Sequence, residues 1–175
     1  MTDTQMTFLK TALDWTKAEM FSSAFFALFG LIFLIASYGF WQFGKTDTAK
    51  AYIIPLLIVG GLLIILGVGL VISNQLRLSQ FPIAFNADAA SFLSSELARA
   101  EKTINGYNNA VYKFIPLIII ACATALIFLR SPIWQASMIA VIAMMAVILF
   151  IDSNASTRMA AYKAQLSEIE QPKAN

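Results

Sequence analysis

Histidine is absent from this 175-residue chain, and cysteine occurs once, as Cys122. Without histidine the chain has no His-ligated haem or metal site and no imidazole for acid–base catalysis. A single cysteine forms no intramolecular disulfide and completes no zinc-ligand spacing. Because an apolar setting disfavours the reactive thiolate, we expect Cys122 to be a small packing residue. We therefore predict no cofactor and no metal.

Charge is also scarce. Asp, Glu, Lys and Arg make up 13% of the residues, against about 25% in ordinary soluble domains. The net charge of +2 and the lack of a basic cluster argue against nucleic-acid binding. Motifs typical of serine hydrolases, zinc proteases and phosphate loops are missing, and Glu96 and Glu101 do not share a helix face. We predict that the chain is not an enzyme, and no small-molecule substrate is evident.

What the chain has instead is apolar sequence, at 59% of its residues. The long apolar runs cover residues 21–44, 51–74, 111–129 and 131–151. A bilayer core about 30 Å thick requires roughly 20 apolar residues in a helix, because lipid cannot satisfy unpaired backbone groups. The pattern predicts an all-α, multi-pass membrane protein with four transmembrane helices in two antiparallel hairpins, accompanied by amphipathic cytoplasmic helices.

The expected organisation has five parts, with the two short turns, residues 44–50 and 130–132, outside the cell. The five parts are a cytoplasmic helix (1–20), a first hairpin (21–74), a cytoplasmic helical linker (75–110), a second hairpin (111–152) and a cytoplasmic helix with a tail (153–175). We expect a helix break at Phe81-Pro82, a helix cap at Asn86 or Asp88, and a kink within residues 105–109.

The orientation follows from the basic residues. With both termini in the cytoplasm, the outside carries only Lys45, Lys50 and Arg130, and the inside carries the other nine. These nine are Lys10, Lys17, Arg77, Arg99, Lys102, Lys113, Arg158, Lys163 and Lys173. The positive-inside rule therefore predicts a cell (inner) membrane protein with both termini cytoplasmic.

Apolar residues in the predicted cytoplasmic segments recur at steps of three and four, as they do along one face of a helix. In the first segment the stripe is Met6, Leu9, Leu13, Thr16 and Met20. Two interpretations are open: the segments continue the spans and pack on one another, or they also dock a partner. The candidate partner interface consists of Leu93, Leu97, Ile104, Met159 and Leu166.

Small residues mark the expected contacts between spans, because close backbone approach strengthens dispersion in a membrane. Several recur at seven-residue steps, which keeps one face turned toward a neighbour. The candidate packing residues are Ser23, Gly30, Ser37, Gly60, Gly67, Ala121, Ala125, Ala136 and Ala140.

Ionisable residues near the spans are few. Lys113 and Asp152 stand at the same predicted depth by the inner interface. Each can act alone, with Lys113 reaching the headgroups and Asp152 ending its helix, or the two can form a pair with a gating role.

These observations predict a non-enzymatic inner-membrane subunit or scaffold, embedded in membrane lipid and acting through helix–helix association. Its partners would be copies of itself in an oligomer or the subunits of a larger complex, such as a secretion or conjugation apparatus. The alternative is an oligomeric pore, since four apolar helices alone enclose no polar lumen.

Overall fold

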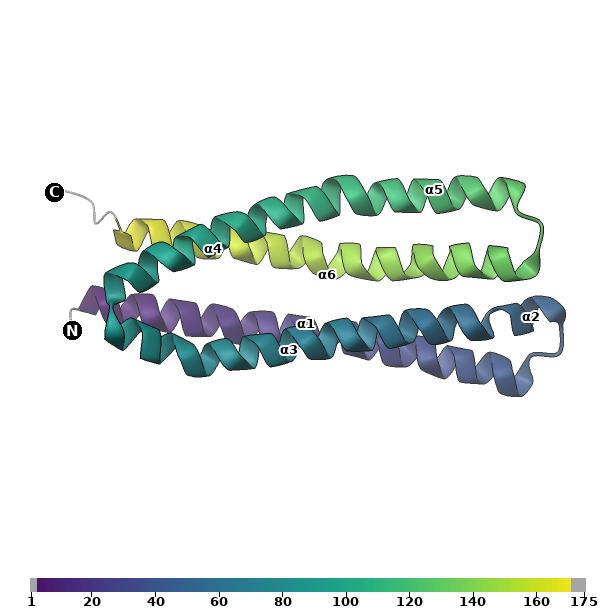
Figure 1. The fold of residues 1–175 in the computed structure, drawn as a ribbon, viewed down its shortest axis with the longest axis horizontal. Helices are drawn as coiled ribbons and strands as arrows, with labels where there is room; N and C mark the ends of the chain where they lie inside the picture. The colour runs from purple at the N-terminus through teal and green to yellow at the C-terminus, as the bar shows by residue number, and fades with distance from the viewer. Residues whose placement is uncertain (1–2, 171–175) are drawn as a thin grey trace.

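The computed structural model describes residues 3–170 as an elongated, all-helical molecule (Figure 1). Lys173 and the outer ends of the first and last predicted segments lie outside the described residues. In chain order the elements are α1 (Asp3–Phe43), α2 (Asp47–Ala51), α3 (Ile53–Ala87), α4 (Ala89–Asn109), the π-helical turn η1 (Ala110–Phe114), α5 (Ile115–Phe128) and α6 (Pro132–Glu170).

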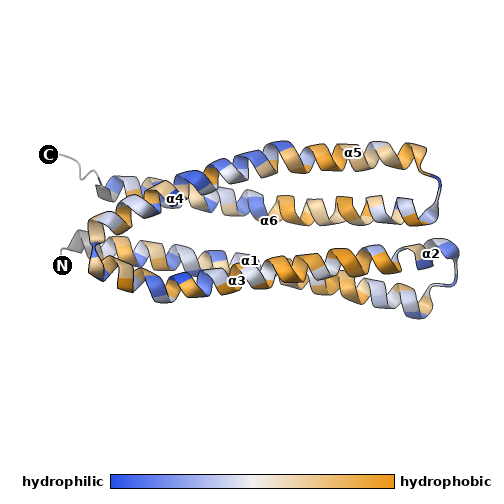
Figure 2. Cartoon of the chain, viewed as in Figure 1, coloured by the Kyte–Doolittle hydropathy of each residue, from blue (hydrophilic) through white to orange (hydrophobic). Residues whose placement is uncertain are grey.

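Within residues 3–170, four helices are long and apolar enough to cross a membrane, which confirms that part of the predicted fold. With 41 residues, α1 is about 60 Å long at about 1.5 Å per residue, twice the thickness of a bilayer core. Apolar residues dominate the half of the molecule near the two turns, and polar residues gather in the half with the chain ends (Figure 2). We call this second half, formed by residues 3–20, 75–110 and 152–170, the terminal bundle.

The most extensive helix contact joins α1 to α3. At Gly30 and Gly60 the backbones approach so closely that a Cβ on Gly30 would lie 2.7 Å from the Gly60 carbonyl oxygen. A Cβ on Gly67 would lie similarly close to the backbone nitrogen of Ala27. The Ser37 hydroxyl donates a hydrogen bond of 2.7 Å to the carbonyl oxygen of residue 53 on α3. Glycine is thus needed here for close approach.

The second helix pair differs from the expectation. Ala136 and Ala140 of α6 are buried, and Ala140 packs with Phe26 and Leu63 from the first pair. On α5, however, Cys122 is buried whereas Ala121 is exposed and Ala125 is half-buried. Placing Ala121 at a contact within the chain was wrong, because a helix that is apolar all round does not reveal which face is packed.

Helix continuity also differs from the expected boundaries. α3 runs through Pro82 to Ala87 and ends only at Asp88, whose carboxylate accepts hydrogen bonds from the backbone amides of residues 90 and 91. Burial of Phe81 and Phe85 in the core stabilises the helix across the proline. Residues 105–109 are helical, and the irregularity comes one turn later, in η1.

Candidate functional site: paired charges in the terminal bundle

The terminal bundle is held at its far end by an aromatic cluster from three helices. The Phe8 ring of α1 lies 5.4 Å from Phe92 of α4 and 6.0 Å from Phe85 of α3, between centroids. The buried face of α1 therefore follows Phe8, Ala12 and Trp15. Of the stripe expected on this helix, Thr16 is fully buried and Leu9 and Leu13 pack against the same core, whereas Met6 is 53% exposed.

The candidate partner-interface residues are used inside the chain. Met159 and Leu166 of α6 are 1% and 0% exposed and belong to the core of the terminal bundle. Leu93, Leu97 and Ile104 of α4 pack against that core and are half-buried. In this structure these residues join helices of one chain, so little of this stripe is available to a partner.

A buried ion pair lies on α4, close to Phe92 of the aromatic cluster along the chain. Glu96 of α4 is 4% exposed and accepts two hydrogen bonds from Arg99, of 2.8 Å and 2.6 Å. The Tyr162 hydroxyl of α6 donates a third, of 2.9 Å. The Arg99 guanidinium also lies 4.6 Å from the centre of the Trp15 ring, which stacks on Tyr162. Trp15 of α1 and Tyr162 of α6 thus contact the pair on α4.

The protonation of this cluster reflects its surroundings. Burial raises the pKa of the Tyr162 phenol well above its ordinary value, and the charge of Glu96 raises it further. Burial alone would lower the pKa of Arg99, but its hydrogen bonds and charge interaction with Glu96 outweigh that effect and raise it. Neutral tyrosine and charged arginine are therefore favoured, as stable structural hydrogen bonding requires.

A second pair lies closer to the spans. Glu19 of α1 accepts a hydrogen bond of 3.0 Å from Arg158 of α6 and one of 3.2 Å from the Tyr107 hydroxyl of α4. Burial raises the Tyr107 pKa, and the charge of Glu19 contributes to the rise. These three residues come from distant parts of the sequence, so this pair, like the first, joins α1, α4 and α6.

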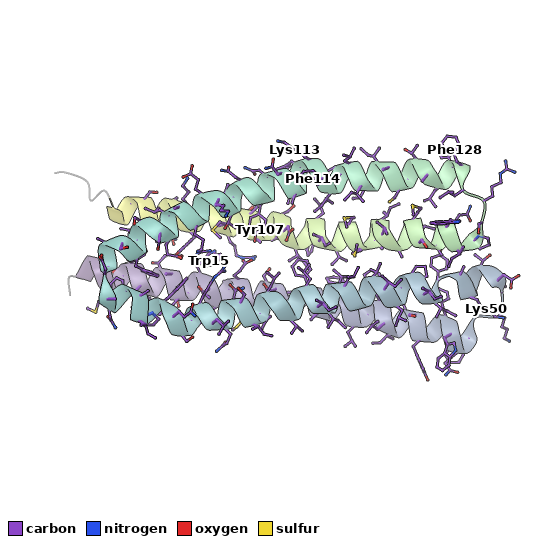
Figure 3. All side chains as sticks on the ribbon, viewed as in Figure 1. Trp15, Lys50, Tyr107, Lys113, Phe114 and Phe128 are labelled. Atoms are coloured by element: carbon purple, nitrogen blue, oxygen red, sulfur yellow. The ribbon has the colours of Figure 1, made fainter. Side chains whose placement is uncertain are left out.

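Lys113 and Asp152 are not joined by an ion pair in the described part of the chain. Lys113 is exposed and lies on the outer side of the ribbon, whereas Tyr107 lies toward α6 (Figure 3). Of the two alternatives, the Lys113–Asp152 pair therefore does not form: equal depth along two helices does not place two side chains on facing sides.

Sequence reasoning missed both pairs. A signal existed: Trp15 and Glu19, Glu96 and Arg99, and Arg158 and Tyr162 are three or four residues apart, on the faces that pack. Within residues 3–170, no three of the metal-ligating side chains converge. Because each glutamate is held by an arginine and a tyrosine, the geometry is that of a structural cross-link between helices.

Comparisons with protein-family models, curated proteins and solved structures find no match to this chain.

Proposed function

We propose that this chain is a non-enzymatic component of the cell membrane that works through helix–helix association. One observation carries the proposal: α5 packs on α6 and on the adjoining η1, with no comparable contact to α1 or α3 among the described residues. Ala121 and Thr124 lie on exposed sides of α5. Small residues on an open helix face permit the close approach on which association in membranes depends.

The alternative surfaces support association less well. The paired glutamates and the apolar stripe of the terminal bundle are engaged within the chain. In the apolar half, Ser37 is buried and its hydroxyl donates to a backbone carbonyl oxygen of α3, so this polar group is engaged within the chain. The partner that we propose is a second copy of this chain, which meets it along α5.

The proposed orientation places the terminal bundle and both termini in the cytoplasm, because nine of the twelve basic residues then lie inside. In a Cys122→Ser background, Ser94→Cys should react with an impermeant maleimide only after the membrane is opened. Thr48→Cys, in the opposite turn, should react in intact cells. Both positions are exposed, so access depends on side alone. Labelling of Ser94→Cys in intact cells would contradict this orientation.

Particle mass in lipid nanodiscs tests the association. We expect the wild-type particle to contain at least two copies, and Ala121→Leu to reduce that number because the added bulk separates the α5 helices. Helicity should not change, since the Ala121 side chain contacts little within its own chain. Ala146→Leu, at an exposed alanine of α6, is the matched control and should keep the wild-type mass.

A wild-type particle that contains one copy would overturn the proposal. An unchanged particle mass for Ala121→Leu would show that the interface does not lie on this face of α5. If the wild-type protein conducts ions in a planar bilayer, the oligomeric pore replaces the scaffold as the better description.

A further inference from the structure

A groove follows the contact between α1 and α6 where the terminal bundle meets the apolar half. It consists of three neighbouring hollows of about 300, 270 and 190 Å³, of which the first two lie between α1 and α6 and the third is lined by α1 alone. Arg158 lines both the first and the second hollow, and Phe21 and Phe25 line both the second and the third. The shared residues show that the three hollows are neighbours.

Two residues at the end of the groove in the terminal bundle carry buried hydrogen-bond donors that have no partner within residues 3–170. Trp15 is 8% exposed, and its indole Nε1–H has no acceptor in the described part of the chain. The same holds for Nε–H of Arg158, whose Nη2 is the atom that binds Glu19. Both residues line the first hollow. Buried polar groups nearly always have partners, so two unpaired donors at one hollow point to an acceptor that binds there.

The other end of the groove is apolar. Phe21, Phe25, Phe150 and Ile151 line the second hollow, and Phe21, Phe25 and Leu28 line the third. Phe21 begins the first predicted span and Ile151 ends the fourth. The groove therefore changes from polar to apolar where headgroups give way to acyl chains.

The charges around the polar end are balanced. Asp14 also lines the first hollow, with its carboxylate 3.8 Å from the Lys17 ammonium, and Glu19 faces Arg158 at 3.0 Å. The site thus offers N–H donors without a large excess of positive charge. We propose that this groove binds one phospholipid, with its phosphate oxygens accepting from Trp15 and Arg158 and an acyl chain along Phe21 and Phe25.

Native mass spectrometry of delipidated protein, titrated with phosphatidylethanolamine or phosphatidylglycerol, tests this site. Trp15→Phe keeps an aromatic ring but removes the N–H, and it should weaken binding roughly tenfold, as expected for one hydrogen bond. Ala24→Phe fills the apolar hollow from an exposed position and should weaken binding at least as much. Ala146→Phe, exposed on α6 and outside the three hollows, is the matched control and should bind like the wild type.

A phospholipid headgroup and free inorganic phosphate offer the same acceptor oxygens, and a titration with inorganic phosphate distinguishes the two. A phospholipid site predicts that phosphate alone at millimolar concentration does not raise the melting temperature, whereas the phospholipid does. Stabilisation by phosphate that persists in Ala24→Phe would overturn the lipid proposal in favour of a free-anion site. Unchanged phospholipid affinity in both Trp15→Phe and Ala24→Phe would overturn the site itself.

Discussion

Replacing Arg99 with methionine is expected to lower the free energy of unfolding by about 3 kcal/mol, because it leaves the buried Glu96 carboxylate without its cation. Glu96 is 4% exposed and loses two of its three hydrogen bonds in this variant. The variant also removes the guanidinium from the Trp15 ring. Unfolding in mixed micelles, followed by circular dichroism, measures the change.

Two further variants identify the cause. Lys102→Met removes a positive charge from an exposed position on the same helix and should change stability by less than about 0.5 kcal/mol. Combining Arg99→Met with Glu96→Leu should recover part of the loss, because replacing a buried pair with apolar residues is much less costly than breaking it. If Arg99→Met melts like Lys102→Met, the Glu96–Arg99 pair does not hold the terminal bundle together.

Replacing Gly30 with leucine is the second change for which we expect a large effect, a loss of at least about 2 kcal/mol. A Cβ there would lie 2.7 Å from the Gly60 carbonyl oxygen and 2.9 Å from the backbone nitrogen of residue 64. Backbone atoms cannot rotate away as a side chain can, so α1 and α3 must separate. The thermal unfolding midpoint in detergent should fall accordingly.

Gly61→Leu is the matched control for this change. Gly61 is the neighbour of Gly60 on α3, and a Cβ there meets nothing within 4 Å. We expect its melting temperature to stay close to that of the wild type. Equal melting of the Gly30 and Gly61 variants would show that the α1–α3 contact tolerates separation and contributes little to stability.

Four bilayer-length apolar runs were sufficient to predict an all-α chain, because a lipid environment permits few backbone structures. The close contact of α1 and α3 was also readable, since Gly30, Gly60 and Gly67 recur on the side where the two backbones meet. Asp88 likewise caps α4 as one of the two residues expected to do so. Apolar runs, recurring glycines and a capping aspartate could be interpreted from the sequence because each has one dominant structural role.

Tertiary structure decided which face each helix presents. The periodicity of α1 pointed to the row of Leu9, Leu13 and Thr16, and packing centres the buried face on the adjoining row with Phe8, Trp15 and Glu19. It left Ala121 exposed on α5, and it carried α3 through Pro82 because Phe81 and Phe85 pack in the core. It also brought Glu19 to Arg158, 139 positions away. Hydropathy reports how apolar a segment is, whereas the rotation of a helix about its axis is determined by all its neighbours together.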